Sequence, residues 1–327
     1  MRFLFLPLFA ACFFSLTVSA QGQDPVRMTT RSAIDSPETE EGDDLMAMLE
    51  NDESASPAKP DYVTATFKAT RVVNGHSVEN MGKGVMDFRI THRFGNVNQG
   101  VKDLFGLDQA FTRIGFDFGI TDWLMVGIGR SSFLKEYDGF AKLRLLRQRT
   151  EGMPLSVSYA GGISIRTDEV VMPGGEEFFF SNRVAYSNQI LVARKFGDWL
   201  SLQVMPTHIH YNLVPQVNDP NDLLALGIGG RLKLNRRFTL NAEWYYRLNG
   251  EEFEGTRNPL SIGVDIETGG HVFQLHFTNS TGTTERAFVG QTTGNWADGD
   301  IRFGFNISRV FTIVRPKEMK GSRNSIY

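Results

Sequence analysis

Residues 111–133, FTRIGFDFGITDWLMVGIGRSSF, alternate apolar side chains with polar or small ones along two consecutive runs. In the first run, Ile114 and Phe116 lie on one face, and Arg113 and Asp117 lie on the other. Strict alternation indicates a strand whose two faces meet different surroundings. Because one face carries charges, these strands cannot be buried in apolar surroundings on both sides.

The same period of two recurs between residues 83 and 314. Regular runs lie at 84–94, 113–129, 142–145, 155–164, 199–209, 223–234, 238–247, 262–267, 273–277 and 301–308, and a less regular run lies at 182–195. Divided at their turns, these runs predict about twelve strands, an even number that brings both ends of the array to one side.

The connections between these runs alternate in length. Tight turns are expected at 119–123, 196–200, 234–238 and 267–271, and long polar loops at 95–108, 166–181, 211–222, 249–258 and 280–299. Short turns at one end and long loops at the other are typical of a transmembrane barrel. A soluble sandwich also alternates, but its apolar face needs a partner sheet. The sequence therefore predicts an all-β fold, a single antiparallel up-and-down transmembrane β-barrel with its apolar face toward lipid.

Residues 1–20, MRFLFLPLFAACFFSLTVSA, combine a basic start, an apolar run and small residues before Gln21, which predicts a secretory signal peptide. The chain is therefore expected to leave the cytoplasm and reach the outer membrane of a Gram-negative cell. Cys12 is the only cysteine, so cleavage would leave no thiol for a disulfide or a metal. Lipidation at Cys12 is an alternative, but the apolar run continues past it.

Three further segments flank the barrel. Residues 21–60 are rich in Asp and Glu and predict a disordered acidic linker. Within it, residues 43–51 show helical spacing, which suits a short helix that docks on a periplasmic protein or a transient helix in a solvated tail. Residues 61–82 are strand-like and suit an extra strand pair, a lead-in strand or a lumen plug. The barrel is expected over 83–314, followed by a tail at 315–327.

Four stretches carry a family resemblance: TFKATRVVNGHSVE (66–79), GKGVMDFRITHRFG (82–95), GLDQAFTRIGFDFGITDWLMVGIGRSS (106–132) and YDGFAKLRLLRQ (137–148). They resemble a family of secreted β-barrel proteins from Bacteroidota-type bacteria that is described as a domain of unknown function. The resemblance spans roughly residues 60–314 and implies the barrel fold and the export. It implies no activity and no catalytic residue.

Strand parity predicts which charged residues face the lumen. The expected lumen-lining residues are Asp87, Arg89, Arg113, Asp117, Lys142, Arg144, Arg231, Lys233, Glu243, Arg247, Asp265 and Arg302, together with Arg93, Arg166 and Glu267. Cations outnumber carboxylates in this set, although the whole chain has a net charge of −3. Such a lumen suits the passage of anionic solutes, or the charges form structural pairs that fill a narrow barrel.

Other candidate sites are weaker. His208 and His210 lie two residues apart on one strand face, but no third metal ligand accompanies them. Outer-membrane phospholipases of about twelve strands suggest a rim hydrolase, in which His92, His208 or His210 would meet Ser131 or Ser187, yet no motif joins these residues. The glycines at 127–130 and 227–230 lie inside strands and suit small lumen-facing positions, not a phosphate loop.

The sequence thus predicts a non-enzymatic barrel that passes small solutes, passively or through a gate. The alternative is a closed barrel that serves as a scaffold, and a rim lipid hydrolase comes third. The expected partners are outer-membrane lipid, small solutes and a periplasmic protein at residues 43–51. The weakly negative charge argues against nucleic acid, and no cofactor or metal is expected. Trp123, Trp199, Trp244, Tyr159, Tyr186 and Tyr246 are expected to anchor the barrel at the membrane interfaces.

Overall fold

The computed structural model describes residues 61–169, 178–214, 219–250, 253, 255–268 and 271–314, which belong to one compact unit, Lys59–Tyr327. The predicted signal peptide, acidic linker, helix at 43–51 and tail at 315–327 lie outside the described residues. Among those described, no helix combines the length and apolar character that crossing a membrane requires.

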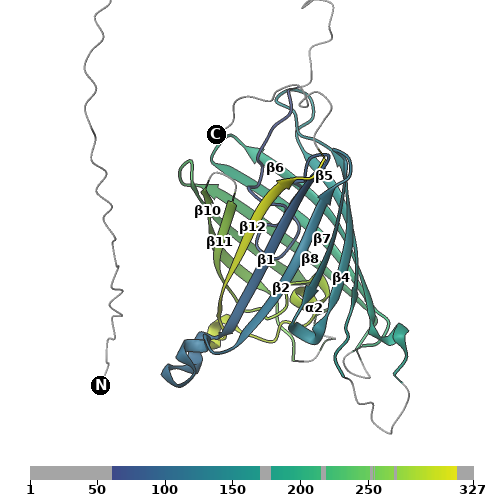
Figure 1. Ribbon diagram of the computed structural model, residues 1–327, viewed down its shortest axis with the longest axis vertical. Coiled ribbons are helices and arrows are strands. Elements are labelled where there is room, and N and C mark those ends of the chain that lie inside the picture. Colours follow the sequence, from purple (N-terminus) through teal and green to yellow (C-terminus); the bar gives the residue numbers. More distant parts are fainter. Residues whose placement is uncertain are drawn as a thin grey trace, which may run out of the picture. The chain divides into compact units, whose positions relative to one another are not determined.

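Twelve antiparallel strands form a closed barrel in which each strand pairs with its neighbour in sequence and β1 pairs with β12 (Figure 1). The strands are β1 (Val85–Asn96), β2 (Ala110–Gly119), β3 (Leu124–Ser131), β4 (Tyr137–Leu146), β5 (Ser156–Ile165), β6 (Val184–Phe196), β7 (Leu200–Tyr211), β8 (Asp222–Lys233), β9 (Phe238–Arg247), β10 (Leu260–Thr268), β11 (His271–Thr278) and β12 (Arg302–Thr312). The predicted fold and strand number are confirmed.

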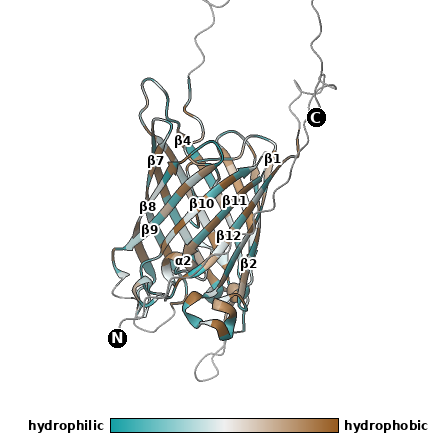
Figure 2. Cartoon of the chain, turned by 90° about the vertical axis from the view of Figure 1, so that its left-hand side faces the viewer, coloured by the Kyte–Doolittle hydropathy of each residue, from teal (hydrophilic) through white to brown (hydrophobic). Residues whose placement is uncertain are grey.

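The faces of the strands are arranged as the alternation predicts. Apolar residues such as Ile114, Ile128 and Leu226 are exposed on the outer wall, whereas Arg113 and Asp117 are buried inside. The hydropathy colouring alternates along the strands in the same way (Figure 2). An oily exterior around a polar interior suits a barrel in lipid.

The two ends of the barrel differ. The end that carries the β2–β3, β6–β7, β8–β9 and β10–β11 turns is called the turn end here, and the opposite end is the loop end; β1 begins and β12 finishes at the turn end. Two connections depart from the predicted alternation in length. Residues 132–136 join β3 to β4 tightly at the loop end, and 147–155 form a longer connection at the turn end.

The longer β4–β5 connection holds the chain as it enters the barrel. Tyr62 bridges to Arg149, the Val63 amide donates to the Gln148 carbonyl at 3.0 Å, and the Thr150 amide donates to the Asp61 carbonyl at 3.0 Å. These backbone pairs explain why this connection is longer than a tight turn: its additional residues form hydrogen bonds with the segment that enters the barrel.

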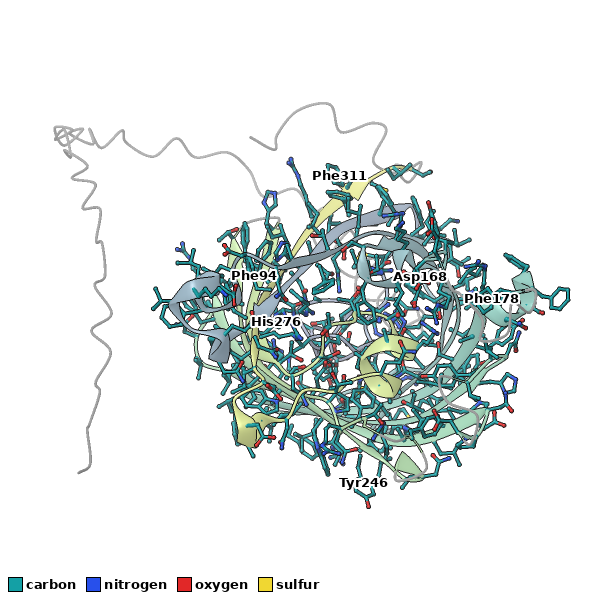
Figure 3. All side chains as sticks on the ribbon, turned by 90° about the horizontal axis from the view of Figure 1, so that it is seen from below. Phe94, Asp168, Phe178, Tyr246, His276 and Phe311 are labelled. Carbon is teal, nitrogen blue, oxygen red and sulfur yellow. The ribbon has the colours of Figure 1, made fainter. Side chains whose placement is uncertain are left out.

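Two inserts fill the lumen, which a view along the barrel shows occupied by side chains (Figure 3). Residues 66–79, here called the lumen hairpin, enter from the turn end, and residues 279–292, here called the lumen loop, enter from the loop end between β11 and β12. The lumen loop contains α2 (Glu285–Gly290), all of whose residues are buried. The inserts also supply apolar packing, because Phe67, Val72, Val78, Phe288 and Val289 join wall residues in one buried cluster.

Candidate functional site in the barrel lumen

The lumen hairpin turns sharply between Arg71 and His76, which form an isolated antiparallel bridge. The Val72 amide donates to the Gly75 carbonyl at 2.8 Å, and the Ser77 amide donates to the Thr70 carbonyl at 3.0 Å. At Gly75 a Cβ atom would lie 2.0 Å from the Tyr245 hydroxyl, so only glycine fits this approach to the wall. The tip of the turn is therefore residues Val73 to Gly75.

One wall carboxylate binds the tip. Glu243 on β9 accepts the backbone amides of Val73 at 3.2 Å, Asn74 at 2.7 Å and Gly75 at 3.0 Å. Three amides that converge on one carboxylate stabilise its negative charge where no water reaches it. Glu243 is 2% exposed, so the amides of the tip replace the water that would otherwise stabilise its charge. The same hydrogen bonds fix the position of the tip.

Two cations on the barrel wall bind the two arms of the hairpin through backbone carbonyls. Lys142 on β4 donates from Nζ to the carbonyls of Thr70, Ser77 and Glu79 at 3.3, 3.0 and 2.6 Å. Arg231 on β8 donates to the Ala65 and Thr66 carbonyls at 2.7 and 3.2 Å. The Lys142 ammonium uses all three of its donors on the hairpin, so it bridges the two arms.

Side-chain amides of wall residues bind the hairpin backbone from other strands of the barrel. Gln203 on β7 accepts the Val78 amide at 2.9 Å and donates to the His76 carbonyl at 2.7 Å. Gln274 and Asn306 donate to the carbonyls of Val72 and Val73, each at 3.0 Å. The backbone of the hairpin is thus hydrogen-bonded to the wall around most of the barrel's circumference.

The lumen loop is held from the loop end by a second set of contacts. Glu136 accepts hydrogen bonds from the Thr284 hydroxyl and, at 2.8 Å, from Arg286. The Tyr211 hydroxyl donates to the Arg286 carbonyl at 3.0 Å. Burial raises the pKa of the Glu136 carboxyl, and the Arg286 charge and the Thr284 hydrogen bond oppose that rise.

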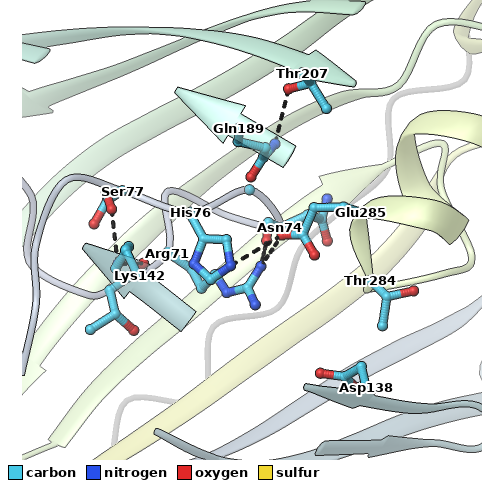
Figure 4. A network of polar contacts seen from close by, with 12 residues as sticks. Arg71, Asn74, His76, Ser77, Asp138, Lys142, Gln189, Thr207, Thr284 and Glu285 are labelled. Atoms are coloured by element: carbon cyan, nitrogen blue, oxygen red, sulfur yellow. Dashed lines mark hydrogen bonds and ion pairs between the residues drawn. The ribbon is translucent and has the colours of Figure 1, made fainter. Parts of the chain in front are cut away.

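The hairpin and the loop meet in the middle of the lumen (Figure 4). Arg71 Nη1 donates to Glu285 Oε1 at 2.5 Å, and His76 Nε2 lies 3.5 Å from the same oxygen. The His76 ring packs edge-on against Phe140, with centroids 4.5 Å apart. Two segments that enter from opposite ends therefore share one buried ion pair.

The structure places the predicted lumen residues as follows. Asp87, Arg89, Arg93, Arg113, Asp117, Lys142, Arg231, Glu243, Arg247 and Asp265 are buried, and Arg144, Lys233 and Arg302 are half-buried near strand ends. Ion pairs join Arg89 to Asp87 at 2.8 Å and Arg113 to Asp138 at 2.5 Å. Arg166 pairs with Asp168, and Glu267 pairs with Lys68 of the hairpin.

Strand glycines make room for buried side chains. A Cβ at Gly129 would lie 2.3 Å from Arg113 Nη2, and one at Gly127 would lie 2.2 Å from the Phe140 ring. A Cβ at Gly227 would lie 2.5 Å from the Tyr245 ring. These positions are the small lumen-facing sites that the sequence predicts.

Several central residues are missing from the predicted lumen-lining set. Glu136, Tyr211, Tyr245, His276, Glu285 and Arg286 are buried in the lumen or at its loop end. Parity gives the inward direction of Tyr245, since it alternates with the outward Trp244 and Tyr246. No comparable signal marks Glu285 and Arg286, which lie in a segment that the sequence places among the long polar loops.

The histidines and serines of the hydrolase alternative are not brought together. His208 Nε2 and His210 Nδ1 both contact Asp222 Oδ1 at 2.8 Å on the outer wall. Ser187 sits on the inner face between buried Ala185 and Gln189, and Ser131 accepts the Phe133 amide. Among the described residues, no cluster of three His, Cys, Asp or Glu side chains is arranged to hold a metal.

Exposed aromatic residues form two groups on the outer wall. Trp123 and Trp199 lie in turns at the turn end, and Trp244, Tyr246 and Tyr186 lie toward the loop end. Amphipathic rings at two levels of a barrel are typical of interfacial anchoring.

Comparison with solved structures returns barrels at low sequence identity. The KdgM porin is 9% identical, with a TM-score of 0.41 over 69% of this chain and 99% of the porin. The COG4313 outer membrane channel from Pseudomonas putida F1 is 12% identical, with a TM-score of 0.44 over 72% and 98%. Outer membrane phospholipase A from Escherichia coli is 9% identical, with a TM-score of 0.43 over 76% and 98%.

No curated protein matches the chain. A family model, described as a membrane bound beta barrel domain (DUF5777), matches residues 67–311, which include most of the lumen hairpin and nearly the whole barrel. This confirms the resemblance to a β-barrel family of unknown function, and the chain belongs to this family of membrane-bound β-barrel domains.

Proposed function

We propose that the protein is an outer-membrane barrel that passes small solutes, preferentially anions, when the lumen hairpin leaves the lumen. The observation that carries this proposal is the kind of contact that holds the hairpin: its backbone is bound by wall side chains such as Lys142, Glu243 and Gln203. Polar contacts of this kind can be exchanged for water when the hairpin withdraws, whereas the apolar packing of Phe67, Val72 and Val78 would be lost and opposes withdrawal.

The preference for anions follows from which wall charges the hairpin neutralises. Arg89 and Arg113 keep their carboxylate partners on the wall when the hairpin leaves. Lys142 and Arg231 donate to hairpin carbonyls, and Arg93 donates to Asn74 of the hairpin at 2.6 Å. These three cations would lose partners, and so would three carboxylates, because Glu243 loses the hairpin amides, Glu267 loses Lys68 and Glu285 loses Arg71. The proposed preference for anions therefore rests on Lys142, Arg231 and Arg93 themselves, which would face the solute as cations without an ion-pair partner among the described residues.

Planar-bilayer recording tests this proposal. The chain over residues 21–327 is compared with a variant that lacks residues 21–82, and circular dichroism verifies that both are folded barrels. The variant should give stable conductance steps with a reversal potential of anion preference in a salt gradient, and Arg231→Ala should weaken that preference. A folded barrel that shows no conductance without the hairpin would end the passage proposal.

A closed scaffold is the second candidate, and the filling of the lumen favours it. Two cavities beside the inserts, one lined by Arg71 and Arg89 and the other by Glu285 and Arg286, each have a volume of about 10 Å³. A scaffold should lose a co-purifying partner when residues 21–60 are deleted, whereas a gated channel should keep its conductance. The predicted docking segment, 43–51, is removed by the same deletion.

A further inference from the structure

A small cavity lies between the lumen hairpin and the wall of β1 and β2. Four arginines line it: Arg71 from the hairpin, Arg89 and Arg93 from β1, and Arg113 from β2. Thr283 of the lumen loop also contributes to the lining. None of the described residues that line this cavity is acidic.

Several donors around the cavity lack partners. Arg89 Nε and Nη1, Arg93 Nε and Thr283 Oγ1 are buried and have no hydrogen-bond partner among the residues that the structure describes. Arg89 is 3% exposed and Arg93 is 0% exposed, so bulk water does not satisfy these atoms. A buried donor without a partner is costly, and several at one cavity indicate that a ligand accepts from them.

The charges around the cavity are unbalanced. Arg71 pairs with Glu285, Arg89 pairs with Asp87, and Arg113 pairs with Asp138. Arg93 forms no ion pair within the described part of the chain, and its guanidinium donates only to the uncharged oxygens of His92, Asn306 and Asn74. A fully buried cation that contacts no carboxylate is costly, so a negative charge in contact with it would be stabilising.

We propose that the cavity binds one halide ion, chloride under physiological conditions. A guanidinium only donates hydrogen bonds, so an acceptor that carries charge fits this lining better than water, which must also donate. A cavity of about 10 Å³ has room for about one water molecule, which excludes phosphate or sulfate, and a halide, which is somewhat larger than water, requires the arginine side chains to move slightly outward. Because Arg71 and Thr283 come from the two inserts and Arg89, Arg93 and Arg113 come from the wall, the ion joins all three parts. This site does not depend on solute passage.

Crystals of the full chain grown with bromide in place of chloride test the site directly. An anomalous bromide peak in contact with Arg89 and Thr283 Oγ1 is expected. An ordered water at this position without anomalous signal, or an empty cavity, would overturn the proposal.

Thermal unfolding in detergent gives a second test, which involves no conductance and so stays separate from the passage proposal. At equal ionic strength, sodium chloride or bromide should raise the unfolding temperature by about 2–4 °C over sodium gluconate, once the halide exceeds its dissociation constant several-fold. Thr283→Val should reduce this difference. Thr292→Val is the matched control, because Thr292 is buried in the same loop and donates to the Phe288 carbonyl instead. Equal unfolding temperatures of the unaltered chain in both salts would contradict the site.

Discussion

Arg71 of the lumen hairpin donates to Glu285, the first residue of α2, although the two residues are 214 positions apart in the sequence. The hairpin enters from the turn end and α2 enters from the loop end, so this contact links the two inserts inside the barrel. A change at the loop end that moves Glu285 would therefore weaken the hold on the hairpin. The ion pair is a direct contact through which a change at one end of the barrel can affect the segment that enters from the other.

Glu285→Gln should release the hairpin more often. Breaking a buried pair by neutralising one partner leaves an uncompensated charge and costs about 3–5 kcal/mol. The frequency of conducting events in planar bilayers should rise by about a hundredfold or more. Combining Arg71→Met with Glu285→Gln removes both charges and should restore much of the closed state. Lys68→Met is the control, because its partner Glu267 is 42% exposed, and such pairs contribute little.

Lys142→Met should weaken the hold on both arms of the hairpin, since one ammonium bridges the carbonyls of Thr70, Ser77 and Glu79. The readout is maleimide labelling of Ser77→Cys, a position that is fully buried when the hairpin is docked. Labelling should accelerate by about ten- to a hundredfold if the lost contacts are worth about 1.5–3 kcal/mol. Lys233→Met, a half-buried cation on β8, should leave the labelling rate unchanged. Equal rates in both variants would show that Lys142 does not hold the hairpin.

Glu243→Gln should destabilise the closed barrel by about 2–4 kcal/mol, because a neutral amide cannot accept three backbone amides as strongly as a carboxylate. The denaturant midpoint of the folded protein in detergent should fall accordingly. Glu267→Gln is a control that removes a more exposed carboxylate. An unchanged midpoint for Glu243→Gln would mean that the tip of the hairpin does not depend on this charge.

Acid should favour release of the hairpin. Burial lowers the pKa of His76 well below its ordinary value, and the charges of Arg71, Lys142, Arg113 and Arg89 lower it further. Glu285 is the carboxylate that faces it, at 3.5 Å. The docked imidazole therefore stays neutral, whereas a released one takes up a proton below a pH of about 6.5. Docking is fully stable above this pH and weakens by up to about 1.4 kcal/mol for each unit that the pH falls below it.

Labelling of Ser77→Cys between pH 7 and pH 5 measures this effect, after correction for the reactivity of a free thiol. The corrected rate should rise toward acid pH in the unaltered background and should change much less with His76→Asn. His276→Asn is the control for the other fully buried histidine, which lies on β11. A corrected rate that is flat with pH would contradict the role assigned to His76.

The sequence is sufficient to predict the barrel but not the closure of its lumen. Alternation assigns Arg113 and Asp117 to the inner face because side-chain direction in a strand has a fixed period. It cannot place residues 66–79, because that segment folds as a turn whose position depends on wall residues such as Glu243, about 170 residues away. The buried position of the lumen loop cannot be predicted for the same reason. Glu285 reads as an ordinary polar loop residue in the sequence, and only its contact with the distant Arg71 places it inside the barrel.

The most direct test of hairpin movement is a disulfide that joins the hairpin to the wall. Asn74 Nδ2 donates to Ser261 Oγ at 2.9 Å, and Cys12, the only cysteine, lies in the predicted signal peptide. Asn74→Cys with Ser261→Cys would cross-link the tip to β10, whereas Ser261→Cys with Thr278→Cys, whose native hydroxyls are 2.9 Å apart, joins only β10 to β11.

Planar-bilayer recordings of both double variants, oxidised and then reduced, measure whether solutes pass only when the hairpin is displaced. We expect no conducting events for the oxidised tip cross-link, recovery on reduction, and equal conductance of the wall cross-link in both states. Undiminished conductance of the fully oxidised tip cross-link would contradict this expectation, because ions would then pass with the hairpin in place.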